Sequence, residues 1–142
     1  MLASLCNLPV DADITGVRVA YTGGSPLPTE LAARFEATLG IPVRNILGMT
    51  ECAGVISIEP FLGPRTPGSC GLPLPFTTVE AVAPDGQVCA PGATGVLRVR
   101  GPHVGPGYTD ARRNPGTFEP GGWLVTGDLG HVDAGGRVFV TG

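Results

Sequence analysis

The chain has 142 residues and a formal net charge of −3 at pH 7. It contains 23 glycines and 15 prolines, together a little over a quarter of its positions, and it contains no lysine. Because glycine and proline break helices, this composition excludes a helical bundle. Since 42% of the residues are hydrophobic and only 15% are charged, the sequence argues against intrinsic disorder and predicts a loop-rich globular fold.

Charge and hydropathy exclude two further classes of protein. The nine arginines are dispersed, apart from the neighbours Arg112 and Arg113, so they form no basic stripe for nucleic acid. No stretch approaches the 18 or more apolar residues of a membrane span, and the start of the chain lacks the basic region of a signal peptide. We therefore expect a cytoplasmic protein with no nucleic-acid partner and no membrane span. Its four cysteines lie far apart with no C-x-x-C pair, which predicts reduced, mostly buried thiols.

The first half of the chain has the pattern of a βαβ unit. An apolar run over 17–22 ends in Gly23 and Gly24, and apolar side chains then recur at every fourth position over 31–39, which predicts a helix. A second short strand follows over 43–47. Strand, helix and strand in about thirty residues are typical of a right-handed crossover between parallel strands.

This topology has a consequence for function. The carboxyl ends of two parallel strands open on the same edge of a sheet, where α/β folds bind ligands. We therefore expect Gly23 and Gly24 to lie beside the segment 48–51, although the two stand about 25 positions apart.

After Pro60 the sequence changes to short β-type runs that are separated by turn signals about every ten residues. We expect this half to be mostly antiparallel, with Trp123 in its core. A final hairpin pairs either 123–125 or 129–132 with 137–140 and turns at 133–136. The other expected runs are 77–83, 87–90 and 96–100.

Five segments resemble, in order and spacing, motifs of the adenylate-forming enzymes, and most closely those of the AMP-forming acyl-CoA synthetases, or acid–CoA ligases. One such motif alone is weak, whereas five in order over nearly the whole chain are a strong signal. The segments are 21–27, 47–51, 68–73, 95–102 and 122–128.

The resemblance implies an activity and its cofactors. Enzymes of this family run to several hundred residues and make an acyl-adenylate from a carboxylic acid and ATP. They then pass the acyl group to a thiol, usually that of coenzyme A. The implied cofactors are ATP or AMP and Mg²⁺, with coenzyme A as co-substrate and a small-molecule carboxylic acid as partner.

The chain would be an internal fragment of the large N-terminal domain of such an enzyme. The other partners would be the missing N- and C-terminal parts of the same enzyme, which carry the two family lysines. Since this chain has no lysine, we expect it to be inactive alone. The resemblance also implies the fold class, α/β. Residues 1–66 would be a βαβ piece of a mostly parallel sheet with the adenine and magnesium motifs. Residues 67–142 would form a β-rich, distorted-barrel-like subdomain ending in the ribose-binding hairpin.

Three side chains carry the catalytic and ribose roles that the resemblance implies. Glu51 would be the magnesium ligand, Thr50 would donate its hydroxyl near the α-phosphate, and Asp128 would accept both ribose hydroxyls. Each has a simpler alternative. Thr50 and Glu51 also fit the start of a helix, and Gly127 with Asp128 also fits a turn.

The remaining predicted nucleotide contacts follow the two strands. Gly23 and Gly24 would approach the adenine edge, and Asn45 would hydrogen-bond the base. The alternative for the glycines is a strand-to-helix turn that needs them for its conformation, and the alternative for Asn45 is a turn or an edge strand. Leu47 stands where the family usually has an aromatic residue, so it would cover the ring without stacking.

Ser25, Gly48 and Met49 complete the predicted nucleotide-binding set. Small side chains at Ser25 and over 53–55 would also leave room for a bulky acid, although packing between helix and sheet explains them equally well.

Two other functions stay open on the sequence alone. One is a non-catalytic nucleotide-binding or interaction module. The other is an adenylation domain of the peptide-synthetase type, although no convincing acidic partner for a substrate ammonium group is present. The sequence specifies neither the acid nor the thiol acceptor.

Overall fold

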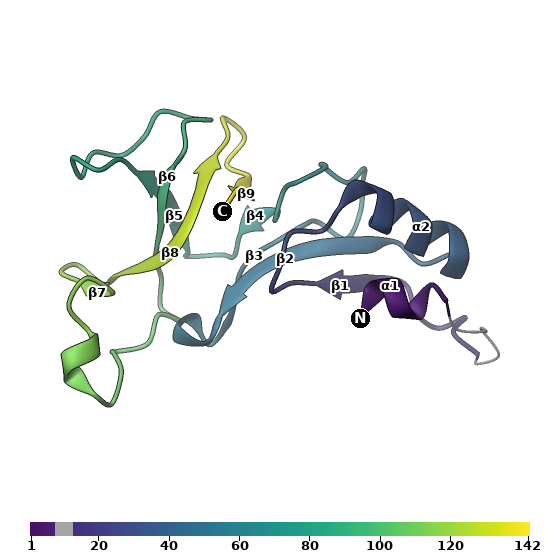
Figure 1. Ribbon diagram of the computed structural model, residues 1–142, viewed down its shortest axis with the longest axis horizontal. Coiled ribbons are helices and arrows are strands. Elements are labelled where there is room, and N and C mark those ends of the chain that lie inside the picture. Colours follow the sequence, from purple (N-terminus) through teal and green to yellow (C-terminus); the bar gives the residue numbers. More distant parts are fainter. Residues whose placement is uncertain (8–12) are drawn as a thin grey trace.

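The structure is a computed structural model that describes residues 1–7 and 13–142 (Figure 1). It consists of two sheets and two α-helices, with 3₁₀ turns η1 and η2 between strands. The elements are α1 (Leu2–Leu5), β1 (Ala20–Thr22), α2 (Thr29–Leu39), β2 (Val43–Met49), η1 (Thr50–Cys52), β3 (Gly54–Ile58), β4 (Leu72–Pro73), β5 (Thr78–Val82), β6 (Gly95–Arg100), η2 (Ala111–Arg113), β7 (Phe118–Glu119), β8 (Trp123–Val132) and β9 (Val138–Val140). In the part of the chain that the structure describes, no helix is long and apolar enough to cross a bilayer.

The first sheet has the order β1-β2-β3-β4 and confirms the βαβ unit. Strands β1 and β2 run parallel and are joined through α2. The α/β class is confirmed with one correction of detail: β2/β3 and β3/β4 are antiparallel, so this part of the sheet is not mostly parallel. For β2 and β3 the reason is the tight turn η1, which Ala53 closes in a left-handed conformation (φ 52°). A connection this short can return the chain only antiparallel.

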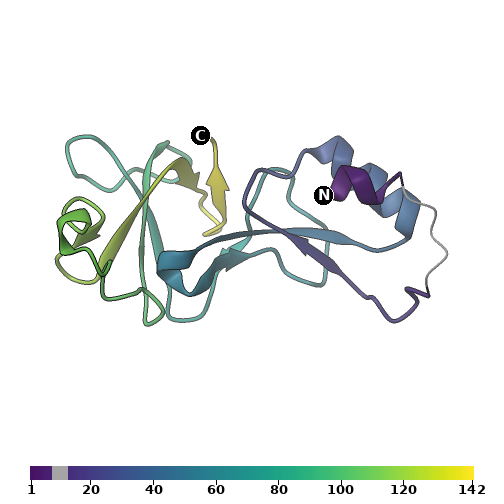
Figure 2. The same ribbon diagram turned by 60° about the horizontal axis from the view of Figure 1, so that its bottom comes forward.

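Helix α2 covers one face of this sheet, and in Figure 2 both helices lie on the same side of it. Glu30 in its first turn suits the helix dipole, and Gly40 ends the helix in a left-handed conformation (φ 66°), as the sequence predicts. Phe35 is only 3% exposed and lies in a small core that is separate from the main one. That core consists of Leu27, Ala32, Phe35, Ile41 and Val43.

Two predicted strands are shorter than the sequence suggested. Strand β1 begins only at Ala20, since Val17 is 47% exposed and has no sheet to pack on. The run 87–90 forms a single bridge, between Val82 and Val88, instead of a strand. Pro91 follows directly and has no N–H to extend a ladder.

The second sheet is antiparallel, with the order β5-β6-β8-β7 and with β9 on β8. The predicted final hairpin forms in its second alternative, since His131 pairs with Phe139. Asp133 shapes its turn by accepting hydrogen bonds from the N–H groups of Gly135 and Arg137, each at 2.8 Å.

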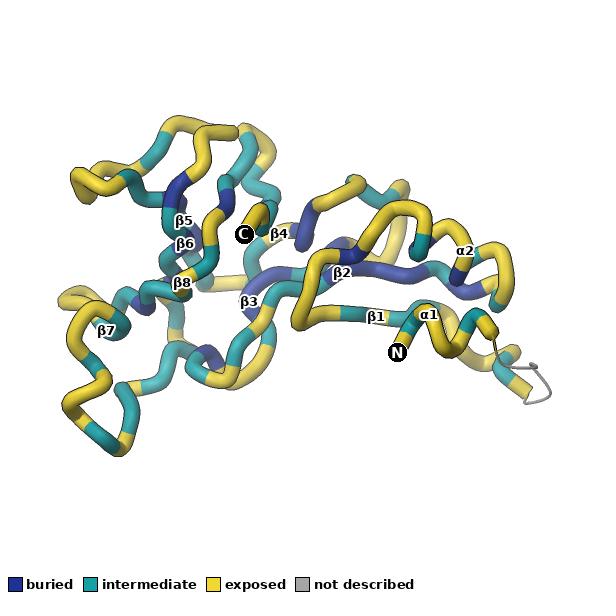
Figure 3. The backbone as a smooth tube through the Cα atoms, in the orientation of Figure 1, coloured by how far each residue is buried: buried dark blue, intermediate teal, exposed yellow. Residues whose placement is uncertain are grey.

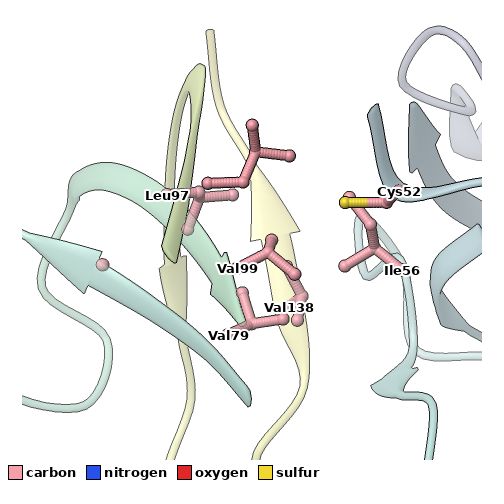
Figure 4. Packing of buried hydrophobic residues seen from close by; sticks show 8 residues of the cluster. Cys52, Ile56, Val79, Leu97, Val99 and Val138 are labelled. Carbon is pink, nitrogen blue, oxygen red and sulfur yellow. The ribbon is translucent and has the colours of Figure 1, made fainter. Parts of the chain in front are cut away.

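The main core lies between the two sheets, and Figure 3 shows buried, dark blue segments on β3 as well as on β5 and β6. Cys52 of η1 and Ile56 of β3 face Val79, Leu97, Val99 and Val138 of the second sheet (Figure 4). This shared core fixes the end of β2 relative to β8. The division into 1–66 and 67–142 stays a prediction.

The prediction that Trp123 belongs to the core is wrong. Its neighbour Leu124 is fully buried, and because side chains alternate along a strand, Trp123 points to the outer face. There the guanidinium carbons of Arg98 and Arg100 lie 4.3 and 4.7 Å from the ring centroid. Trp123 is therefore held by cation–π contacts with these two arginines and not by burial in the core.

Candidate functional site

Two hollows adjoin at the carboxyl ends of β1 and β2. The first has a volume of about 620 Å³, and its lining includes Gly23 and Gly24 together with Gly48, Met49 and Thr50. The two segments therefore lie side by side, as the sequence predicts. The same hollow reaches the small residues Ala53, Gly54 and Val55, which were expected near a bulky acid.

The second hollow is a cleft of about 410 Å³ at the junction of the two sheets. It brings together most of the predicted nucleotide-binding residues, from both sheets. Ser25 lines this cleft and not the first hollow. The predicted residues in it are Gly24, Ser25, Asn45, Leu47, Gly48, Met49 and Asp128.

Backbone geometry alone explains glycine after β1. A Cβ at Gly23 would lie 2.8 Å from Ile46 Cγ1, and Gly24 has a φ of +84°. The strand-to-helix turn therefore requires both glycines whether or not a ligand binds. Their absent side chains still leave backbone exposed at the edge of both hollows.

Asn45 lies on the central strand β2, so the edge-strand interpretation is wrong. The residue is 4% exposed, and its Nδ2 donates to Ser69 O at 3.3 Å and to Cys70 Sγ at 3.4 Å. Its Oδ1 is buried and has no hydrogen-bond partner among the described residues. A buried acceptor without a donor is costly, so this atom is suited to accept from a ligand.

Asp128 lies inside β8, at an irregularity of the strand and not in a turn between strands. Three residues of β8, 126–128, stand opposite Leu97 alone, because the register shifts between Val96 and Arg98. The N–H of Asp128 donates to Thr126 Oγ1 at 3.1 Å, and Gly127 has a φ of +84°. Bulges of this kind re-aim a side chain, and here Asp128 lines the cleft.

Thr50 and Glu51 begin the 3₁₀ turn η1 directly after β2. The capping position belongs to Met49, and no side chain caps the turn, so the Thr50 hydroxyl is not used for capping. Glu51 lines a third hollow of about 260 Å³ together with His103 and Tyr108.

The hydroxyl of Tyr108 donates to Glu51 Oε1 at 2.5 Å. This hydrogen bond is the main cause that lowers the pKa of Glu51, followed by the backbone N–H of Glu51 and the charge of Arg113. The same bond raises the pKa of the Tyr108 phenol. The site therefore holds an ionised carboxylate beside a neutral phenol.

The donor set suits Mg²⁺ in one particular mode. Within residues 1–7 and 13–142, no group of three or more His, Cys, Asp or Glu side chains could cage a metal ion. Mg²⁺ is commonly held by one or two carboxylates together with phosphate oxygens. Glu51 beside the hydroxyl of Thr50 fits that mode, in which the nucleotide completes the coordination.

Comparison with known proteins decides the family. The AMP-binding enzyme family matches residues 1–109, well over half of the chain. The chain belongs to the AMP-binding enzyme family. Several of its relatives are acid–CoA ligases. A marinolic acid–CoA ligase from Pseudoalteromonas sp. (strain SANK 73390) is 36% identical over 99% of this chain and 22% of its own length. The 2-succinylbenzoate–CoA ligase of Bacillus subtilis is 36% identical over 99% of this chain and 28% of its own.

Solved structures of AMP-binding enzymes share the fold. The O-succinylbenzoate coenzyme A synthetase of Bacillus subtilis, in complex with ATP and a magnesium ion, superposes with a TM-score of 0.82. It is 34% identical, and the match covers 98% of this chain and 29% of that one. The chain thus spans about a quarter of the length of the relatives it matches. It resembles the AMP-forming acid–thiol ligases over that portion.

One side chain of the candidate site was not predicted from the sequence. Tyr108 stands 57 positions from Glu51, and no local pattern links the two. The pairing arises because the loop after β6 folds back on η1, where Gly105 N–H donates to Glu51 O at 2.8 Å. The glycine-rich segment 101–107 was the available signal, since it marks a backbone that approaches another closely.

Proposed function

We propose that this chain is part of an AMP-forming acid–CoA ligase, which converts a carboxylic acid and ATP to an acyl-adenylate and then transfers the acyl group to coenzyme A. One observation carries the proposal: acceptors from both sheets, Asn45 and Asp128, meet in one cleft with the backbone of the glycine turn. The identity with acid–CoA ligases supports it. We place the reaction in the cytoplasm, in line with the sequence-based expectation.

The cleft would hold the nucleoside of ATP. Gly23 and Gly24 would offer backbone to the adenine edge, and the free Oδ1 of Asn45 would accept from the exocyclic amino group. Leu47 would cover the base without aromatic stacking. The carboxylate of Asp128 would accept both ribose hydroxyls, a bidentate arrangement that separates a nucleotide from free phosphate.

Glu51 would hold Mg²⁺ at the phosphate end. A Mg²⁺ ion held there would offset the negative charge that develops as pyrophosphate leaves. Thr50 lines both the first and third hollows, and its hydroxyl would donate to an oxygen of the α-phosphate. Electrostatic stabilisation of this type is often the largest catalytic contribution.

The first hollow would receive the acid. Its volume of about 620 Å³ and the small side chains Ala53 and Val55 suit a bulky fatty or aryl chain. Its rim at Gly48 and Met49 is shared with the nucleotide cleft, so the carboxylate of the acid would meet the α-phosphate there. Holding both reactants at one edge would supply the proximity that the first half-reaction needs.

The cations that drive adenylation would come from outside these 142 residues, because the chain contains no lysine. We therefore propose that the chain alone is inactive and that the remaining parts of the enzyme complete the site. Loss of one such contact typically costs about two to three powers of ten in rate.

Pyrophosphate exchange into ATP tests this proposal. The complete polypeptide, at the length of its relatives, should catalyse exchange that depends on an added fatty or aryl acid. The 142-residue chain should show none. Robust exchange by the lysine-free chain would contradict the proposed division of roles, and a complete polypeptide that binds ATP but activates no acid would favour a non-catalytic nucleotide-binding module.

A further inference from the structure

The loop between β6 and β7 holds Glu51 at two points. Gly105 N–H donates to the backbone oxygen of Glu51 at 2.8 Å, and the Tyr108 hydroxyl donates to its Oε1. One contact fixes the main chain of Glu51 and the other fixes its carboxylate. Both come from one short stretch of the second half of the chain.

Tyr108 is itself held in place by contacts with residues other than Glu51. Its N–H donates to Asn114 Oδ1 at 2.7 Å, and its ring packs edge-on against Phe118 with 5.3 Å between centroids. The guanidinium carbon of Arg113 lies 4.8 Å from the centre of the ring. A side chain fixed by three neighbours can orient a carboxylate, because it loses little further freedom in doing so.

The choice of donor matters for a cation site. Within the described ranges, Tyr108 is the one side chain that hydrogen-bonds the Glu51 carboxylate, and no arginine forms a salt bridge with it. Arg113 contacts the ring of Tyr108 instead. A neutral phenol orients the carboxylate without a cation that would compete with Mg²⁺ for its charge.

We propose that Tyr108 is a positioning residue for the magnesium ligand: its hydroxyl occupies Oε1 of Glu51 and presents Oε2 to the metal ion. This inference rests on the proposed function, in which Glu51 holds Mg²⁺. Hydrogen-bonded partners of metal ligands typically contribute about 10–100-fold to metal affinity. Tyr108 therefore acts on the affinity for Mg²⁺ and not on the affinity for the nucleoside.

Tyr108→Phe isolates this role, because it removes the hydroxyl and keeps the ring that packs on Phe118. Calorimetric titration of the complete polypeptide with ATP, at rising Mg²⁺ and in EDTA, separates the two affinities. In Tyr108→Phe the Mg²⁺ concentration for half-maximal enhancement of ATP binding should rise about tenfold. The ATP affinity in EDTA should stay unchanged. Tyr21→Phe is the matched control, since Tyr21 is the other of the chain's two tyrosines and lines none of the three hollows.

Glu51→Gln distinguishes the two proposals. If ATP binding by Glu51→Gln keeps its full Mg²⁺ dependence, the metal role of Glu51 is wrong. If Glu51→Gln abolishes that dependence while Tyr108→Phe stays within about twofold of the parent, the metal role stands and the positioning role of Tyr108 is overturned. Loss of ATP affinity in EDTA by Tyr108→Phe would show that the residue acts on the fold and would overturn the proposal as well.

Discussion

The proposed nucleotide cleft and the Glu51 hollow differ in how their polar groups are hydrogen-bonded before a ligand binds. In the cleft, neither Oδ1 of Asn45 nor the carboxylate of Asp128 accepts a hydrogen bond from the described residues. In the hollow, the Glu51 carboxylate already accepts a hydrogen bond from Tyr108. A nucleoside brings its own donors, so acceptors left free recognise it. A metal ion brings none, so its ligand has to be oriented by the protein.

The strongest test of the cleft is Asp128→Ala. It should weaken ATP binding by at least about a hundredfold, because two hydrogen bonds to a charged acceptor are lost and each contributes about 1.5–3 kcal/mol. Calorimetric titration measures this loss. Asp85→Ala is the control, since Asp85 caps an exposed turn by accepting from Gln87 N–H. Unchanged ATP affinity in Asp128→Ala would refute the ribose assignment.

Leu124→Ala should lower the free energy of unfolding of the whole segment, because the cleft and the Glu51 hollow both rest on the core that the two sheets share. Leu124 is fully buried, and a large-to-small change there costs about 2–5 kcal/mol of unfolding free energy. Denaturant unfolding followed by circular dichroism measures the change. Leu62→Ala, at a residue that is 79% exposed, should be nearly neutral. If Leu124→Ala changed the unfolding free energy as little as Leu62→Ala, Leu124 would not support the shared core.

Asn45→Ala sharpens the comparison within the cleft. Removal of Oδ1 should lower ATP affinity about tenfold, the value of one hydrogen bond of about 1.4 kcal/mol. It should leave the affinity for inosine triphosphate unchanged, because that base lacks the exocyclic amino group. Titration of the same protein with both nucleotides gives the ratio. Equal losses for both would mean that Asn45 acts through its bonds to Ser69 and Cys70 and not through the base.

The smallest expected effect concerns Cys52, which is buried directly after Glu51. Burial, and then the charge of Glu51, raise the pKa of its thiol to about 11. A raised pKa in the folded state stabilises the fold below the thiol's ordinary pKa, and this contribution is lost as the pH rises through the folded value. At pH 9 only about one thiol in a hundred would be ionised. Iodoacetamide should therefore label Cys52 far more slowly than the unfolded chain, as peptide mass spectrometry would detect.

What the sequence could predict depended on short-range patterns. The spacing of strand, helix and strand was sufficient to bring Gly23 and Gly24 beside Met49 and Thr50, because parallel strands end on one edge. The antiparallel return after β2 was not predictable in this way, since it depends on Ala53 adopting a conformation that favours glycine. The Glu51–Tyr108 pair was also missed, because a loop conformation and not a periodicity brings it together.

The bulge of β8 also determines which face of the sheet each later side chain of the strand occupies. It adds two residues relative to β6, so the alternation of inner and outer faces is the same on both sides of it. Leu124 before the bulge and Gly130 after it both face the core, and a Cβ at Gly130 would lie 2.8 Å from Leu97 Cδ1. Deletion of one residue at 126–128 would therefore move the side chains of the rest of the strand to the opposite face of the sheet. Deletion of Gly127 and Asp128 together would leave Thr126 opposite Leu97, keep the alternation of the strand and remove the proposed ribose acceptor.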